Sequence, residues 1–193
     1  MKLRGLYAIT PEGGDVERKT RLALEGGIAL LQYRQKKRDL ALARAIVRLA
    51  REFQVPVLVN DDVELALEVA ADGAHVGRDD LSVSLSRNKI KGRLLGVSCY
   101  ADPAAAKAAV AAGADYVAFG SVFASPTKPG APRAPHELFR LQLGVPLCAI
   151  GGITLENAPQ LIAAGADLLA VISDLFDAPD VAQRARQYGK LFA

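Results

Sequence analysis

Carboxylates that directly follow short apolar runs are the residues of this sequence best suited to chemistry. Asp61 and Asp62 come after the run PVLVN (56–60), and Asp80 comes shortly after GAHVG (73–77). Carboxylates are hard oxygen ligands, and proteins usually hold Mg²⁺ with one or two of them together with waters and substrate phosphates. Because Asp61 and Asp80 leave neighbouring predicted strands, we expect them to approach one another and to ligate a magnesium ion.

The same acids have a competing structural role, because an Asp that precedes an apolar helix is a favoured N-cap. We expect this capping role more for Asp62 and Asp79 than for Asp61 and Asp80. Cations that could bind a phosphate are also present, since Arg offers a planar fork of donors and Lys a point charge. The cations that we expect to do so are Arg34, Lys36 and Lys128.

A pair of glycines in AIGGIT (149–154) predicts an anion site. Glycines at the end of a strand let the backbone approach a ligand closely, and the exposed N–H groups at a helix start attract an anion. In barrels of parallel strands, the loops after strands seven and eight often bind phosphate. We expect Gly152, together with Ile172 and Ser173 from the following apolar run, to bind a phosphate group.

The longest irregular segment is SVFASPTKPGAPRAPHEL (121–138), which is rich in Pro, Gly and Ser. Such composition marks a loop, and long loops in compact domains often serve as lids. Ser125, Thr127 and Lys128 provide two hydroxyls and a cation in this loop. We expect them to cover a phosphorylated substrate.

Eight short apolar runs must position these residues, and helical or alanine-rich stretches separate them. Runs of 4–7 residues without alternation are typical of strands that are buried on both faces. Alternating strands and helices indicate a parallel sheet, so the chain predicts one (β/α)8 TIM-barrel domain over residues 1–193. Weak repeats support this prediction, because AAGAD occurs at 111–115 and 163–167, with a looser echo at 70–74. The predicted strands are 5–10, 29–34, 56–60, 73–77, 94–98, 115–120, 145–152 and 167–173.

An open doubly wound sheet is the less favoured alternative, because no strand opens into a GxGxxG motif. In a barrel, the working face lies at the carboxyl ends of the strands. Those ends carry most of the side chains that could bind anions or metals. Beyond the charged residues above, the polar side chains at this face are Gln32, Asn60 and Ser98.

Composition narrows the possible functions. The net charge of +3 is too small to indicate nucleic-acid binding, and in the basic run 34–38 we expect Lys37 and Arg38 to be solvated. Cys99 and Cys148 lack a CxxC spacing and predict buried strand residues without a disulfide or zinc site. No signal peptide or membrane-spanning run is present, which predicts a cytoplasmic protein. The oligomeric state, including a homodimer, stays open.

The motifs taken together resemble the thiamine-phosphate synthase family, in order and over nearly the whole chain. That resemblance implies the coupling of hydroxymethylpyrimidine diphosphate to a thiazole phosphate, with release of pyrophosphate and with Mg²⁺ as cofactor. It also implies a dissociative path through a pyrimidine carbocation. The motifs that carry it are GLYAIT, LQYRQK, VNDD, ADGAHVGRDDL, LLGVS, GADYVAFGSVF, SPTK, AIGGIT and AVIS.

The resemblance also implies a role for each matching residue. Gln32, Arg34 and Lys36 match the family's diphosphate-binding motif, with Asn60 beside the metal ligands Asp61 and Asp80. Ser98 matches a contact to the pyrimidine, and Gly152, Ile172 and Ser173 match the thiazole-phosphate site. The lid residues are Ser125, Thr127 and Lys128.

Three positions depart from the family pattern. Pro11 stands where many members have Asp, Ser125 replaces a more usual Thr, and Arg78 replaces a common Gln. The last change puts a pyrimidine contact at that position in doubt.

Three other functions fit the sequence less well. A thiazole tautomerase of the same superfamily would lack the full diphosphate set and would typically carry His where Ser121 stands. A nucleic-acid binder would need a broader basic face with aromatic residues. A sugar-phosphate isomerase would need an acid–base pair, which the sequence does not show, and no Ser–His–Asp arrangement is evident either.

Overall fold

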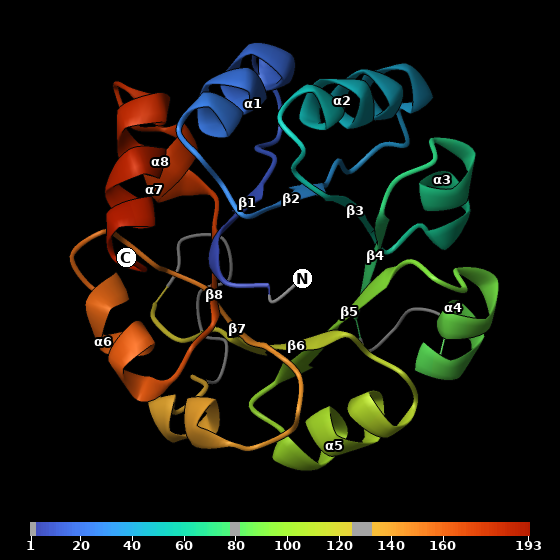
Figure 1. Ribbon diagram of the computed structural model, residues 1–193, viewed down its shortest axis with the longest axis vertical. Coiled ribbons are helices and arrows are strands. Elements are labelled where there is room, and N and C mark those ends of the chain that lie inside the picture. Colours follow the sequence, from blue (N-terminus) through green and yellow to red (C-terminus); the bar gives the residue numbers. More distant parts are fainter. Residues whose placement is uncertain (1–2, 78–81, 125–132) are drawn as a thin grey trace.

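The computed structural model describes residues 3–77, 82–124 and 133–193, and its eight strands form a closed parallel barrel in chain order. β8 pairs with β1, so the sheet has no edge (Figure 1). This confirms the predicted (β/α)8 TIM barrel, and each strand lies within its predicted run except β5, which extends beyond 94–98 to Tyr100. The strands are β1 Gly5–Ile9, β2 Leu30–Tyr33, β3 Val57–Asn60, β4 Gly73–Val76, β5 Leu94–Tyr100, β6 Tyr116–Gly120, β7 Leu147–Ile150 and β8 Leu168–Val171.

Helices form an outer ring around the barrel (Figure 1). Between β6 and β7 the described residues contain a 3-10 helix, η1 His136–Arg140, in place of an α-helix. None of the described helices is long and apolar enough to cross a membrane. The α-helices are α1 Val16–Glu25, α2 Leu40–Glu52, α3 Val63–Glu68, α4 Val83–Lys89, α5 Pro103–Ala111, α6 Ala158–Ala164, α7 Ser173–Phe176 and α8 Val181–Lys190.

Aspartate side chains begin most of these helices. Asp15, Asp39, Asp62, Asp102 and Asp180 each accept a hydrogen bond from a backbone N–H in the first turn of the following helix. An N-cap of this kind satisfies one of the four N–H groups that a helix start leaves without a partner. The capping role therefore holds for Asp62, which caps α3.

Two apolar clusters hold the barrel together. The larger one lies between the strands and the helices, and the smaller one fills the barrel interior with residues such as Tyr7, Leu30, Tyr116 and Leu168. Successive residues of a strand point to opposite faces, so strands such as β1 and β6 contribute to both clusters. The side chains at the carboxyl ends of the strands close the interior at one end.

The Asp of the repeated motif AAGAD, and of its looser copy at 70–74, has a structural role. Asp72, Asp115 and Asp167 directly precede β4, β6 and β8. Each accepts a hydrogen bond from a backbone N–H near the start of the preceding strand, and the donors are Val57 of β3, Leu95 of β5 and Leu147 of β7. At Asp167 the bond from the Leu147 N–H is 3.0 Å, and the Asp167 N–H returns a bond of 2.8 Å to the Leu147 carbonyl. These reciprocal pairs fix the strand register at the end of the barrel opposite the functional face.

Replacing Asp167 with Ala should lower the free energy of unfolding by about 1–2 kcal/mol, because the Leu147 N–H loses its acceptor. Urea denaturation measures this change. Asp167→Asn is the matched control, since it keeps an acceptor oxygen and should lose clearly less. Equal losses in both variants would contradict the assignment, as would an unchanged Asp167→Ala.

Candidate active site

The carboxyl end of β3 carries two adjacent side chains of the predicted diphosphate site. Asn60 Nδ2 donates to Asp61 Oδ2 at 2.5 Å, and the Asp61 N–H donates to the His75 carbonyl of β4 at 2.8 Å. Asp61 has a φ of 61°, in the left-handed region that non-glycine residues rarely adopt. Residues held in such conformations often lie at functional sites, because the surrounding contacts must enforce them. Here β4 holds the backbone and leaves the carboxylate exposed.

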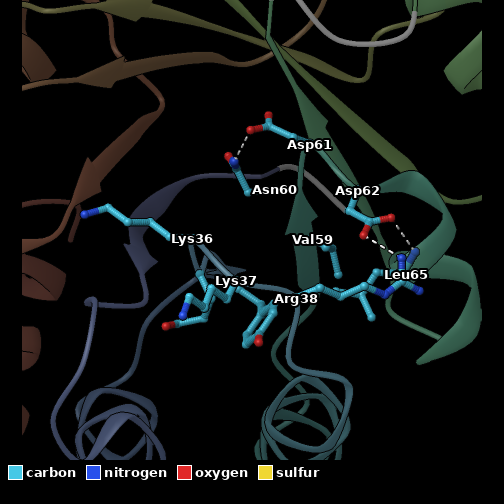
Figure 2. A pocket seen from close by; sticks show the side chains of 10 residues that line it. Lys36, Lys37, Arg38, Val59, Asn60, Asp61, Asp62 and Leu65 are labelled. Carbon is cyan, nitrogen blue, oxygen red and sulfur yellow. Dashed lines mark hydrogen bonds and ion pairs between the residues drawn. The ribbon is translucent and has the colours of Figure 1, made fainter.

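Asp61 and Asp62 point to different partners although they are neighbours in the chain (Figure 2). Asp62 accepts from the Leu65 N–H at 2.8 Å and from Arg38 Nη1 at 2.8 Å. Arg38 also donates to Glu68 at 2.6 Å. Arg38 is exposed, as expected for a solvated loop residue, and it also pairs with the carboxylates of the N-cap and the last residue of α3. Asp62 and Arg38 belong to the scaffold of the site.

A cavity of about 300 Å³ lies between the segments that follow β2 and β3 (Figure 2). Lys36 and Lys37 line it from one side, and Asn60 and Asp61 line it from the other. The structure thus brings the predicted cation Lys36 to the same cavity as the predicted metal ligand Asp61. Cations and an acid around one opening suit a phosphate group with a bound divalent ion.

Arg34 follows β2, where hydrogen bonds to the segment directly after β1 fix its backbone. The Arg34 N–H donates to Thr10 Oγ1 at 2.9 Å, and the Thr10 hydroxyl donates to the Arg34 carbonyl at 3.0 Å. Gln35 Nε2 adds a bond of 2.9 Å to the Pro11 carbonyl. The departure at Pro11 therefore keeps a contact through its carbonyl oxygen. Thr10 positions Arg34, a role that the sequence analysis did not assign.

The glycine loop after β7 has a backbone that only glycine adopts readily. Gly151 and Gly152 have φ values of 105° and 63°, and a Cβ built on Gly152 would lie 2.4 Å from the Ala124 carbonyl oxygen. Asn157 holds the loop, because its Nδ2 donates to the Gly152 carbonyl at 3.0 Å and its Oδ1 accepts from Thr154 N–H at 2.9 Å. Asn157 was not predicted as part of the site, although Asn is a common capping residue at the start of a helix.

Ile172 and Ser173 lie directly after β8, next to the strand that leads into the glycine loop. Ser173 is exposed and begins the four-residue helix α7. Gly152 and Ser173 therefore follow two paired strands, as the sequence predicts. Their approach to a phosphate stays a prediction.

A buried chain of hydrogen bonds crosses the barrel interior beneath this face. Gln32 Nε2 donates to Tyr7 OH at 2.6 Å, and Tyr7 OH lies 2.8 Å from Tyr116 OH. His75 joins the chain through Nδ1, 2.7 Å from Tyr116 OH, and through Nε2, 2.8 Å from Ser98 Oγ. Burial raises the pKa of Tyr7 and of Tyr116 well above the ordinary value, so both phenols keep their protons.

Several predicted residues lie outside the part of the chain that the structure describes. They are the metal ligand Asp80, the neighbouring Arg78 and Asp79, and the lid residues Ser125, Thr127 and Lys128. Their roles stay predictions. Within the described ranges, no three His, Cys, Asp or Glu side chains gather as a metal cluster.

Comparisons with known proteins agree with this arrangement. A family model described as thiamine monophosphate synthase matches residues 6–175. The thiamine-phosphate synthase of Aromatoleum aromaticum is 56% identical over 99% of this chain and 97% of its own length. That of an Azoarcus species is 52% identical over 100% of this chain and 98% of its own length.

A solved structure of thiamine phosphate pyrophosphorylase from Pyrococcus furiosus superposes with a TM-score of 0.87 at 29% identity. The match covers 99% of this chain and 96% of that chain. These relatives do not favour the tautomerase alternative. The chain therefore belongs to the thiamine monophosphate synthase family and is a transferase of thiamine biosynthesis.

Proposed function

We propose that the chain couples hydroxymethylpyrimidine diphosphate to hydroxyethylthiazole phosphate and releases pyrophosphate, which yields thiamine phosphate. The observation that carries this proposal is the cavity between the segments after β2 and β3, where Lys36 lies with Asn60 and Asp61. These are three of the residues that match the family's diphosphate site. An assay of the purified chain with both substrates, with and without Mg²⁺, tests the proposal.

The charges account for the reaction type. As the bond between the pyrimidine methylene carbon and the diphosphate breaks, negative charge builds on the leaving group. Arg34 and Lys36 would stabilise that charge, and their cationic groups need no proton transfer to do so. Lys128 would add a third cation from the loop. The thiazole nitrogen then attacks the electron-deficient pyrimidine carbon, so the protein mainly positions two substrates.

The described residues argue against covalent catalysis by Ser98. Ser98 and His75 lie within hydrogen-bond reach, which resembles a nucleophile and its base. The third partner, however, is the neutral phenol of Tyr116 where a Ser–His–Asp triad has a carboxylate. The pair is therefore poorly suited to activate Ser98, and the substitution needs no protein nucleophile.

The donor chemistry of the site fits Mg²⁺. Asp61 presents an exposed carboxylate beside the Asn60 amide, and Mg²⁺ is usually bound by one or two carboxylates with waters and phosphates. Asp61 would hold the ion, with Asp80 as the proposed second ligand. The bound ion would supply positive charge beside the diphosphate. A homodimer and a cytoplasmic location stay predictions from the sequence.

Asp61→Asn should raise the Mg²⁺ concentration needed for half-maximal activity by at least about tenfold, because an amide is a poorer ligand than a carboxylate. Titration of activity against Mg²⁺ measures the change, and thermal unfolding should be almost unaltered. Asp62→Asn is the matched control, since Asn still caps α3. Equal Mg²⁺ dependence in the wild type and Asp61→Asn would remove Asp61 from the metal site.

Gly152→Ala should raise the KM for the thiazole phosphate by about tenfold, because the added Cβ collides with the Ala124 carbonyl and displaces the loop. The KM for the pyrimidine diphosphate should change little. Gly144→Ala is the control, since Gly144 also has a positive φ of 75° but has open space around its Cβ. If both glycine variants changed the thiazole KM alike, the loop geometry would not be the cause.

Lys128→Ala should lower kcat with the fold retained, because one cation that is proposed to stabilise the leaving diphosphate is lost. Steady-state kinetics with both substrates measure the effect, and circular dichroism checks the fold. A wild-type kcat would make Lys128 an ordinary loop residue.

A further inference from the structure

The buried hydrogen-bond chain under the active site connects two side chains that match substrate contacts. Ser98 matches a contact to the pyrimidine, whereas Gln32 matches the diphosphate motif but is 2% exposed and bonded to Tyr7 in the barrel interior. Gln32 on β2 stands at one end and Ser98 on β5 at the other, with Tyr7, Tyr116 and His75 between them. The five residues come from five different strands. Tyr7 is 1% exposed and Tyr116 is 0% exposed, so water does not interrupt the middle of the chain.

The donors and acceptors of this chain fit together in one direction. The Gln32 amide nitrogen can only donate, so the Tyr7 oxygen accepts and its own proton passes to the Tyr116 oxygen. The Tyr116 proton then goes to His75 Nδ1, which leaves the imidazole proton on Nε2 to be donated to Ser98. The Ser98 hydroxyl proton remains for a ligand.

The opposite direction does not fit the orientation of the Gln32 amide. It would need the amide turned over so that its oxygen accepts from Tyr7, whereas Gln32 Nε2 lies 2.6 Å from the Tyr7 oxygen. With the amide in this orientation, a doubly protonated imidazole would leave the Tyr116 proton without an acceptor. Within the described chain, Thr20 Oγ1 is the sole buried side-chain polar atom that lacks a partner, so each buried polar atom of these five residues has one.

A glycine on the neighbouring strand makes room for this chain. Gly96 of β5 is the register partner of both His75 and Tyr116. A Cβ on Gly96 would lie 2.2 Å from the Tyr116 hydroxyl oxygen. The barrel therefore leaves out a side chain at the point where the phenol meets the imidazole.

We propose that this chain fixes the hydrogen-bond polarity of the active-site mouth, with Gln32 presenting an acceptor and Ser98 presenting a donor. The inference rests on the proposed function and deepens it. Tyr7, Tyr116 and His75 are then positioning residues that act on the substrate through Gln32 and Ser98.

The polarity matches the chemistry of an aminopyrimidine. Such a ring carries an amino group, which donates, and a ring nitrogen para to it, which accepts. β2 and β5 are separated by two strands in the barrel, so the two ends reach the mouth from different sides. A ring that lies between them would meet an acceptor on one side and a donor on the other. A site built on hydrogen bonds strongly rejects analogues that lack the matching group.

The test is a double-mutant cycle of Tyr116→Phe and Ser98→Ala, read out as the Kd of the pyrimidine diphosphate by calorimetry and as the KM of each substrate. Tyr116→Phe should raise the Kd and KM of the pyrimidine diphosphate about tenfold, with the thiazole-phosphate KM within about twofold of the wild type. In the Ser98→Ala background the same change should add less than about twofold, because Tyr116 acts through Ser98.

Tyr188→Phe is the matched control. It removes another buried tyrosine hydroxyl, which donates to Asp174 at 2.8 Å and belongs to α8, and it should leave the pyrimidine Kd unchanged. Tyr7→Phe should have a smaller effect than Tyr116→Phe, since Tyr116 can still donate to His75. It serves as the second test if Tyr116→Phe does not fold.

The outcomes separate this inference from the proposed function. A wild type that binds the pyrimidine diphosphate without turnover would refute the function, while the Kd cycle would still decide the inference. Absence of pyrimidine binding by the wild type would overturn both. An unchanged Kd in folded Tyr116→Phe, or additive effects of the two substitutions, would overturn the inference alone.

Discussion

Closure of the barrel is the constraint on which the rest of the structure depends. Once β8 pairs with β1, all strands share one interior and all of their carboxyl ends meet at one face. Side chains from residues that are far apart in the chain then become neighbours, as Tyr7 and Tyr116 do across 109 positions. The register bonds of Asp72, Asp115 and Asp167 hold the opposite end, which frees the mouth for polar residues that contribute little to stability.

In the proposed function, the mouth combines two kinds of recognition with different physics. Around its rim, exposed cations and the Asp61 carboxylate suit a diphosphate and a divalent ion, where charge dominates. In its floor, buried neutral groups suit an aromatic ring, where the direction of each hydrogen bond matters more than charge. Binding energy from the ring can thus orient a substrate whose reactive bond lies nearer to the rim.

Much of the fold and part of the site could be predicted from the sequence, because residue preferences that act over a few neighbouring positions determine them. The apolar runs predicted every strand. The glycine loop was found because positive φ and close approach demand glycine at Gly152. The capping preference of Asp gave the role of Asp62 as one open alternative, which the structure confirmed.

The interior hydrogen-bond chain could not be predicted in this way. Tyr7 and Tyr116 lie within apolar runs and read as core residues, and only the barrel closure shows that their hydroxyls meet. The ion pairs of Arg38 were missed for a related reason, because its partners belong to α3, 24 and 30 residues further along the chain. Likewise, hydrophobic patterning did not show that the described segment between β6 and β7 forms a 3-10 helix.

A crystal structure of the chain with thiamine phosphate, pyrophosphate and Mg²⁺ bound tests the central claim most directly. The account predicts electron density for pyrophosphate between the segments after β2 and β3, in contact with Arg34 and Lys36, and for an ion on the Asp61 carboxylate. Pyrophosphate bound away from this mouth, or Asp61 turned from the bound phosphates, would contradict it.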